Sequence, residues 1–241
     1  PGGAIRRWVE AVRDDNVQGE FYLTDVISVA VGEGVPVVGV SVAESNEVLG
    51  INDRVQLAAA ERVLQRRYAL EVMAQGATLA DPGRFDLRGK LTVGRDVFID
   101  VGAVFTGDVV LGDRVRIGSN SAVSDSSLGE DCLVHEHCVI DGVVAGASCE
   151  IGPFARLRPG TEFQERVKVG NFVEVKASNV APGSKMNHLS YVGDTSVGRD
   201  VNIGAGTITC NYDGAAKHRT QIGDGVFVGS GTMLVAPLVV G

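Results

Sequence analysis

A six-residue repeat of large apolar residues runs through most of the second half of the chain and limits what it can fold into. From Val93 to Val240 the anchors fall at every sixth position, with occasional steps of five. An α-helix needs apolar spacings of three and four, and a straight strand needs strict alternation, so neither explains the pattern. The anchors are Val93, Ile99, Phe105, Leu111, Ile117, Val123, Leu128, Val134, Ile140, Ala145, Ile151, Leu157, Phe163, Val169, Val175, Val180, Met186, Val192, Val197, Ile203, Thr209, Ile222, Val228, Leu234 and Val240.

A short strand that turns a corner after each anchor satisfies this spacing. Each strand points one anchor inward, and the glycine or aspartate that often follows accommodates the bend. Three such sides close a triangular coil, which buries its anchors against the coils above and below. The 32 glycines and only 5% aromatic residues fit many tight turns between short strands. We therefore predict a mainly β fold, a parallel β-helix, over residues 91–241.

The residues before the repeat have an α/β pattern. Residues 4–12 carry apolar side chains at helical spacing, and residues 22–31 form a second apolar segment that we expect to be helical. Residues 35–42 have the pattern of a buried strand. Residues 55–74 contain no glycine or proline and favour one long helix, which Gly76 should end.

The composition excludes several classes of protein. The formal net charge of -8 argues against a nucleic-acid partner, because phosphate binding needs a basic face. No apolar run approaches the roughly 20 residues that span a bilayer, so we expect no membrane segment. The four cysteines, Cys132, Cys138, Cys149 and Cys210, form no CxxC pair and are expected to be reduced, partly buried thiols. A cytoplasmic protein is the expectation.

The longest break in the repeat lies between Thr209 and Ile222, where residues 210–221 exceed one repeat. An extra loop must leave the coil here. Loops that protrude from a rigid scaffold often carry function, although a tolerated insertion is the alternative.

Seven motifs along the whole chain resemble one family, the bacterial N-acetylglucosamine-1-phosphate uridyltransferase/glucosamine-1-phosphate acetyltransferases. The strongest lie in the repeat: GPFARLRPG (152–160), GNFVEVK (170–176), HLSYVGD (188–194) and NIGAGTITCNYDG (202–214). The others precede it: QGEFYLTD (18–25), GINDRVQL (50–57) and DPGRFDLRG (81–89).

This resemblance implies a left-handed β-helix in a homotrimer, a handedness that the usual right-handed rule for parallel crossovers would not predict. It implies acetyl transfer from acetyl-CoA to the amine of glucosamine-1-phosphate. It also implies Mg²⁺-dependent uridyl transfer from UTP to N-acetylglucosamine-1-phosphate, giving UDP-N-acetylglucosamine for peptidoglycan and lipopolysaccharide. The corresponding division is residues 1–54, the end of the uridyltransferase domain; 55–90, a helical linker; and 91–241, an incomplete acetyltransferase domain.

The family's glycine-rich nucleotide loop would lie before Pro1, which is not a methionine, and its last coils would follow Gly241. We therefore expect a fragment that lacks both termini. We expect its uridyl transfer to be inactive.

The acetyltransferase chemistry needs a base for the amine proton and cations for the sugar phosphate. His188 matches the family's catalytic histidine, and imidazole can accept a proton near neutral pH. Arg158 and Lys176 match its phosphate ligands, and both side chains suit an anion. Tyr191 and Asn202 match residues that contact the sugar.

The acetyl-CoA site is implied by residues in and around the extra loop. Asn211, Tyr212 and Lys217 on the loop match contacts to substrate or acetyl-CoA. Ala205 and Ser230 match further acetyl-CoA contacts. The family places this site between neighbouring subunits.

On the uridyltransferase side, Asn52 matches a Mg²⁺ ligand, and an amide oxygen suits that ion. An asparagine before a helix is equally an N-cap, and both can hold. Glu20, Tyr22 and Thr24 are weaker candidates for the sugar pocket.

Other functions remain open on the same scaffold. A β-helical carbonic anhydrase would need histidines that converge on a metal, and His135 and His137 lie two residues apart without a clear third ligand. An acyltransferase that uses acyl carrier protein is the main alternative. A non-catalytic β-helix is a third, although the polar motif residues are all present.

Overall fold

A computed structural model describes residues 2–241 and divides at Gly50 into two compact units. The first unit holds α1 (Gly2–Glu10), α2 (Asp25–Gly32) and the short 3₁₀ helix η1 (Ser45–Val48). The helix predicted for residues 4–12 is confirmed over residues 4–10, and that for residues 22–31 is confirmed over residues 25–31. Glu33 joins the two helices, accepting hydrogen bonds from Trp8 Nε1 (2.8 Å) and Arg7 Nη2 (2.6 Å).

The strand predicted for residues 35–42 is wrong. This segment has no regular secondary structure, and its valines are exposed. A strand needs a neighbour for its backbone groups, and no strand lies within residues 2–50. The apolar pattern alone cannot supply that partner.

The predicted long helix is confirmed as α3 (Arg54–Ala74). Its N-cap is Asp53, whose side chain accepts a hydrogen bond from the backbone N–H of Gln56 at 2.7 Å. The Gln56 side chain in turn accepts from the backbone N–H of Asn52 at 2.6 Å. The helix ends as predicted, with Gly76 just beyond it at a φ of 114°.

The amide of Gln65 attaches α3 to the first coil of the β-helix. It donates to the carbonyl of Leu87 (2.8 Å) and accepts from the N–H of the same residue (2.7 Å). Leu87 lies in β2 (Asp86–Val93), which is paired along its length only with β4 (Val104–Leu111). A side chain thus satisfies backbone groups that an edge strand leaves open.

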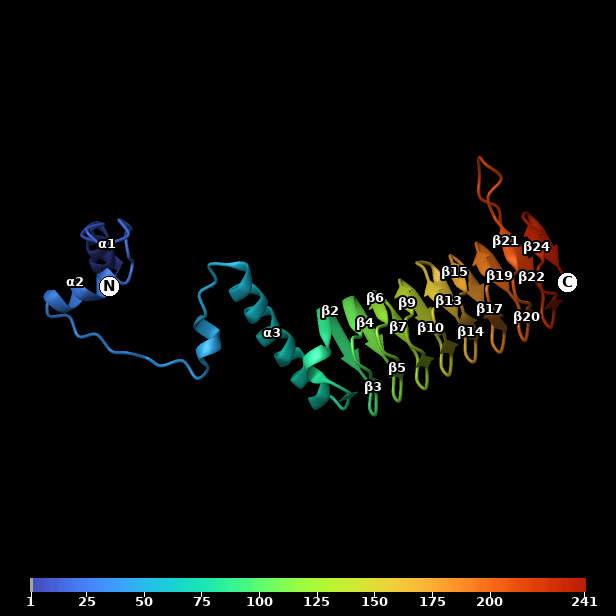
Figure 1. Cartoon of the computed structure of the whole chain (residues 1–241), viewed down its shortest axis with the longest axis horizontal. Coiled ribbons are helices and arrows are strands. Elements are labelled where there is room, and N and C mark those ends of the chain that lie inside the picture. The colour runs from blue at the N-terminus through green and yellow to red at the C-terminus, as the bar shows by residue number, and fades with distance from the viewer. Residues whose placement is uncertain (1) are drawn as a thin grey trace. The chain divides into compact units, whose positions relative to one another are not determined.

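The rest of the second unit is a stack of three-sided coils (Figure 1). The first face is a nine-stranded parallel sheet. The second and third faces form one further sheet, joined through β4, which turns from one face to the other. The predicted fold class, a mainly β chain built as a parallel β-helix, is confirmed.

The strands are short, and each face of the β-helix holds its own set. The first face holds β1 (Thr78–Leu79), β3 (Phe98–Ile99), β5 (Arg116–Ile117), β8 (Leu133–Val134), β11 (Glu150–Ile151), β14 (Lys168–Asn171), β17 (Lys185–His188), β20 (Asn202–Ile203) and β23 (Phe227–Val228). The second holds β6 (Ala122–Ser124), β9 (Val139–Asp141), β12 (Arg156–Leu157), β15 (Glu174–Lys176), β18 (Tyr191–Gly193), β21 (Ile208–Cys210) and β24 (Met233–Val235). The third holds β7 (Ser127–Leu128), β10 (Val143–Ala145), β13 (Thr161–Phe163), β16 (Asn179–Val180), β19 (Thr195–Val197), β22 (Thr220–Ile222) and β25 (Leu238–Val240). The 3₁₀ helix η2 (Pro82–Arg84) precedes β2.

The register explains the steps of five in the repeat. Phe98 pairs with Arg116 and Arg116 with Leu133, so one coil takes 18 or 17 residues. The shorter coils have one residue fewer at the corner between the second and third faces, as between Val123 and Leu128. The extra loop lengthens only one coil.

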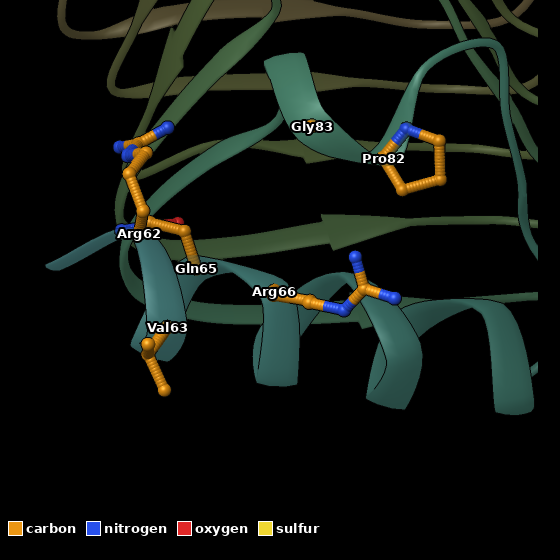
Figure 2. Close-up of a pocket in the computed structure, with 6 residues that line it drawn as sticks. All are labelled: Arg62, Val63, Gln65, Arg66, Pro82 and Gly83. Carbon is orange, nitrogen blue, oxygen red and sulfur yellow. The ribbon is translucent and has the colours of Figure 1, made fainter. Parts of the chain in front are cut away.

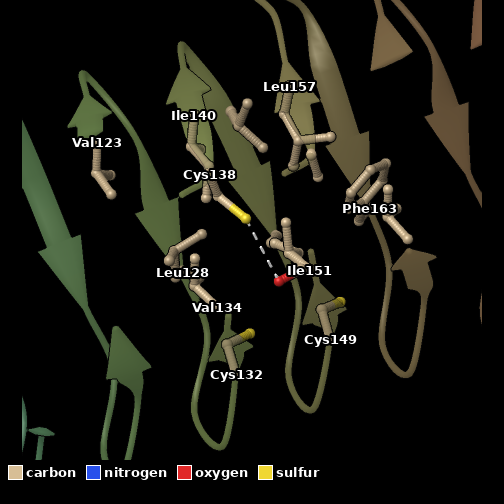
Figure 3. Close-up of a cluster of buried hydrophobic side chains, with 14 of the residues drawn as sticks. Val123, Leu128, Cys132, Val134, Cys138, Ile140, Cys149, Ile151, Leu157 and Phe163 are labelled. Atoms are coloured by element: carbon tan, nitrogen blue, oxygen red, sulfur yellow. Dashed lines mark hydrogen bonds between the residues drawn. The ribbon is translucent and has the colours of Figure 1, made fainter. Parts of the chain in front are cut away.

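The anchors form the core, as predicted. Every anchor is buried except Val240, which is partly buried. Figure 3 shows several of the buried anchors, among them Leu128, Ile140 and Leu157. Cys132, Cys138 and Cys149 are buried and Cys210 is half-buried, and all four are free thiols, as expected. Burial raises the pKa of the Cys138 thiol to about 11, which keeps it protonated and unreactive at neutral pH.

Candidate active site

His188 lies at the end of β17, where the chain leaves the first face. Its Nδ1 is 2.7 Å from Oδ1 of Asn171, and the two residues are register partners on β14 and β17. Leu189 follows in the left-handed region, with a φ of 51°, and turns the chain toward β18. The side chain of His188 is exposed and open to a ligand.

Two of the predicted acetyl-CoA residues stack along the corner of His188. The N–H of Gly206 donates to the carbonyl of His188 at 3.3 Å, and the N–H of Gly231 donates to the carbonyl of Ala205 at 2.7 Å. Ala205 and Ser230 therefore occupy the position of His188 in the next two coils. The structure brings these three predicted residues onto one edge of the β-helix.

A second group lies on the second face, around Tyr191. Arg158, just after β12, pairs through Nη1 with Oε1 of Glu174 on the neighbouring β15 at 2.8 Å. Lys176 Nζ lies 3.7 Å from Asp194 Oδ2, and both side chains are largely buried.

Asn211 joins the extra loop to this group. Its amide Nδ2 lies 3.4 Å from the Tyr191 hydroxyl and donates to the Asp194 carboxylate. Tyr191 and Asn211 are therefore neighbours, as parts of one polar cluster.

The extra loop is a hairpin with its own hydrogen bonds. Tyr212 and Lys217 form an antiparallel bridge, and Asp213 accepts hydrogen bonds from the N–H groups of Ala215 and Ala216. Those backbone bonds, with an ion pair to His218, hold the pKa of Asp213 well below its usual range. The turn of the loop is therefore rigidly specified by one carboxylate.

The hairpin carries Lys217 back to the second face. The Lys176 ammonium beside it lowers the pKa of Lys217, and the Asp194 carboxylate opposes this effect. Two neighbouring ammonium groups with one carboxylate between them leave an excess of positive charge. Such a cluster suits an anionic group of a ligand.

Nine of the predicted acetyltransferase residues thus fall into two groups, and Asn202 lies outside both. The corner group contains His188, Ala205 and Ser230, and the second-face group contains Arg158, Lys176, Tyr191, Asn211, Tyr212 and Lys217. Asn202 begins β20 on the first face, paired with Lys185 and Phe227, apart from Tyr191 on the second.

Sequence reasoning missed three residues that the structure adds: Asn171, Glu174 and Asp194. Each lies one coil from a predicted residue. Asn171 precedes His188 by 17 positions and pairs with it, so counting coil lengths would have found it.

A shallow groove of about 350 Å³ extends from His188 across the first face. At its other end Glu150 binds both Lys168 Nζ (2.7 Å) and His135 Nε2 (3.1 Å). The hydrogen bond from Lys168 and, to a smaller extent, the one to His135 lower the pKa of Glu150. Glu150, Lys168 and His135 bond to one another, and His188 bonds to Asn171 instead.

The two neighbouring histidines do not converge. His135 binds Glu150 on the first face, whereas His137 lies at the corner and stacks on Phe154 with ring centroids 5.0 Å apart. Within residues 2–241, no group of three His, Cys, Asp or Glu side chains is arranged to hold a metal ion. A carbonic anhydrase site therefore has no geometric support here.

A separate cavity of about 360 Å³ lies between α3 and η2 (Figure 2). It is lined by Arg62, Val63, Gln65, Arg66, Pro82 and Gly83. None of the predicted site residues lines it, so the candidate site lies elsewhere.

Asn52 is exposed just before α3, and its N-cap role is wrong because Asp53 is the N-cap. One amide oxygen cannot hold Mg²⁺ alone, and the described residues supply no cluster of acidic ligands around it. The residues present therefore do not fit a complete magnesium site. Glu20, Tyr22 and Thr24 lie in the first unit, exposed or half-buried.

Comparisons with known proteins find a family model, solved structures and curated relatives that are similar to this chain. A family model, the GMPPB C-terminal domain, matches residues 87–183. A solved UDP-N-acetylglucosamine acyltransferase from Campylobacter jejuni is 16% identical, with a TM-score of 0.45 over 65% of this chain and 66% of that one. Among the helices of residues 2–241, none has the length and apolar character needed to cross a membrane.

The curated relatives match the whole chain at much higher identity. The bifunctional protein GlmU of Alkalilimnicola ehrlichii is 58% identical over 241 residues, which are 100% of this chain and 52% of that protein. GlmU of Methylococcus capsulatus is 55% identical over the same share of each chain. The chain spans about half the length of these relatives. It belongs to the GlmU family of bifunctional proteins.

Proposed function

We propose that this chain carries an acetyltransferase site that moves an acetyl group from acetyl-CoA to the amine of glucosamine-1-phosphate. The observation that carries the proposal is the exposed imidazole of His188, held by Asn171 at one corner, with a cationic cluster on the adjoining face. Membership of the GlmU family and the quoted motifs support the same activity.

The chemistry assigns His188 the role of general base. The neutral amine of the sugar attacks the thioester carbonyl, and a C–N bond forms while the C–S bond breaks. His188 accepts the amine proton, and the departing CoA thiolate takes up a proton to leave as the thiol. An imidazole is suited to this cycle because it both accepts and returns a proton near neutral pH.

The second-face cluster binds the sugar phosphate. Arg158, Lys176 and Lys217 supply positive charge, while Tyr191 and Asn211 offer a hydroxyl and an amide for the sugar. Asn202 lies on the first face, apart from this cluster, and its contact with the sugar stays a prediction from the sequence. Glu174 and Asp194 orient the cations by ion pairing.

Acetyl-CoA follows the corner of His188, along Ala205 and Ser230. Tyr212 and Lys217 on the hairpin complete this site from a second chain in a homotrimer. The division of predicted residues between a corner and a face supports a seam between subunits. Each seam would join the corner of one chain to the second face of its neighbour.

The whole protein would also perform the family's Mg²⁺-dependent uridyl transfer from UTP, which yields UDP-N-acetylglucosamine in the cytoplasm. Residues 1–54 would belong to that half, 55–90 to the linker and 91–241 to the acetyltransferase. Asn52 would contribute one amide oxygen to the metal.

The test is the release of CoA thiol on addition of acetyl-CoA and glucosamine-1-phosphate. We expect thiol release with this sugar, much less with amino sugars that lack the phosphate, and none with long acyl chains. Preference for an acyl carrier protein donor would favour the alternative acyltransferase. No release with any donor would leave a non-catalytic β-helix.

A further inference from the structure

We propose that Asn171 is a positioning residue that fixes the tautomer of His188, so that the outward Nε2 is the atom that accepts the proton. Asn171 Oδ1 lies 2.7 Å from Nδ1 of His188. An amide oxygen can only accept at this contact, so Nδ1 must carry the hydrogen. The inference rests on the proposed role of His188 as the base.

The backbone makes this contact specific. Asn171 and His188 are register partners on β14 and β17, and the N–H of Leu189 donates to the carbonyl of Asn171 at 3.0 Å. Both side chains therefore project from paired strands and not from a mobile loop. Residue 170 must be glycine here, because a Cβ would approach the Asn187 carbonyl oxygen to 1.9 Å.

The neighbouring groups of the groove do not compete for the ring. Glu150 is occupied by Lys168 and His135, and within residues 2–241 the side chain hydrogen-bonded to His188 is that of Asn171. The partner of the base is thus a neutral amide. A carboxylate in this place would stabilise the imidazolium after proton transfer, whereas an amide mainly orients the neutral ring.

The tautomer is measured directly by ¹⁵N NMR of the imidazole nitrogens in this chain. The sequence has four histidines, and His188→Gln identifies the signal of His188 by its loss. We expect Nδ1–H to dominate in the original chain and a mixture of tautomers in Asn171→Ala. Dominance of Nε2–H in the original chain, or an unchanged tautomer in Asn171→Ala, overturns the proposal.

The catalytic consequence is measured in a full-length protein, in which this chain replaces the matching half of Alkalilimnicola ehrlichii GlmU. We expect Asn171→Ala to lower kcat by about 10-fold to 100-fold with little change in KM, as for other groups that orient a reacting side chain. Asn171→Asp keeps an acceptor at Nδ1 and should regain most of this loss. Its carboxylate favours imidazolium, so the acid limb of its pH profile should move to higher pH.

Glu136→Ala is the matched control, because residue 136 holds the same corner position two coils before Asn171. It should leave kcat and the pH profile unchanged, and circular dichroism should confirm that each variant folds. Equal kcat in Asn171→Ala and the original protein, with His188→Ala strongly impaired, would overturn the positioning role. If His188→Ala itself keeps its kcat, the proposed base fails, while the NMR result still decides the tautomer.

Discussion

At the scale of single residues, catalysis and binding should separate. His188 faces solvent at a corner, whereas Arg158 is held by Glu174 on the second face. A base acts in the transition state, but a phosphate ligand acts on the bound substrate throughout the reaction. The two side chains therefore predict different kinetic signatures.

His188→Ala should lower kcat by about 10²-fold to 10⁴-fold, the usual contribution of a positioned general base. The fold should survive because the side chain is exposed. Steady-state kinetics of the folded protein measure this change. A near-normal kcat would assign proton transfer to another group.

Arg158→Ala should raise KM for glucosamine-1-phosphate and leave kcat nearly unchanged. It removes one cation of the phosphate site but not the base. Arg199→Ala is the control, because Arg199 is exposed at the corner between the third and first faces, away from the second-face group. An equal rise in KM for both variants would point to a general charge effect.

At the scale of elements, each strand is stabilised by one inward anchor. In β9, Ile140 is fully buried and the preceding Val139 is 49% exposed. Alternate residues of a strand face opposite sides, so neighbours in sequence differ completely in environment. In α3 the inward residues instead recur at helical spacing, and Gln65, Ala69 and Val72 are buried.

Ile140→Ala should destabilise the β-helix by about 2–5 kcal/mol, because it leaves a cavity in a close-packed core. Val139→Ala, one residue away, should change stability by less than about 0.5 kcal/mol. Urea unfolding of both variants provides the comparison. Similar losses would mean that this strand is not oriented as described.

Gln65→Ala should cost about 1–3 kcal/mol locally, since it orphans the N–H and the carbonyl of Leu87. Hydrogen exchange at Leu87 should accelerate, while the later coils keep their protection. Arg66→Ala, on the exposed side of the helix, should leave the exchange of Leu87 unchanged.

At the scale of the whole molecule, stacked coils bring charges of one face together. The pKa of Glu150 lies below its ordinary value because of Lys168 and then His135. The unfolded chain therefore binds this proton more readily than the folded chain. The stability that Glu150 contributes is present above the ordinary carboxyl pKa and is lost as the pH falls through the lowered value.

Glu150→Gln should accordingly flatten the loss of stability below about pH 4.5. Thermal unfolding of both proteins between acidic and neutral pH measures the difference. The variant should be less stable at neutral pH and lose less on acidification. Parallel curves for the two proteins would show that this ion pair does not contribute to acid unfolding.

The assembly is the largest scale. If the site forms at a seam between chains, a full-length chimaera should sediment as a trimer, and dissociation should abolish acetyl transfer. Sedimentation velocity alongside the activity assay tests both. A fully active monomer would contradict the shared site.

The coil and its core follow from the spacing of the apolar anchors. The spacing of the anchors depends only on the path of the chain around one triangular coil. The position of each anchor in the repeat therefore predicted its burial, correctly for every anchor up to Leu234. The long helix could also be predicted from local sequence, because its composition and the following Gly76 define its length. The candidate site residues were predicted from the resemblance of the motifs, which says nothing of how these residues are arranged in space.

Tertiary structure decided what depends on partners distant in sequence. The strand expected at residues 35–42 has no neighbour to pair with, so its valines remain in an irregular segment. Asp53 and not Asn52 is the N-cap of α3, because the Asp53 side chain accepts a hydrogen bond from the backbone N–H of Gln56. Asn171 meets His188 only because the coil between them has 17 residues, and that number is set by the corner that each coil turns.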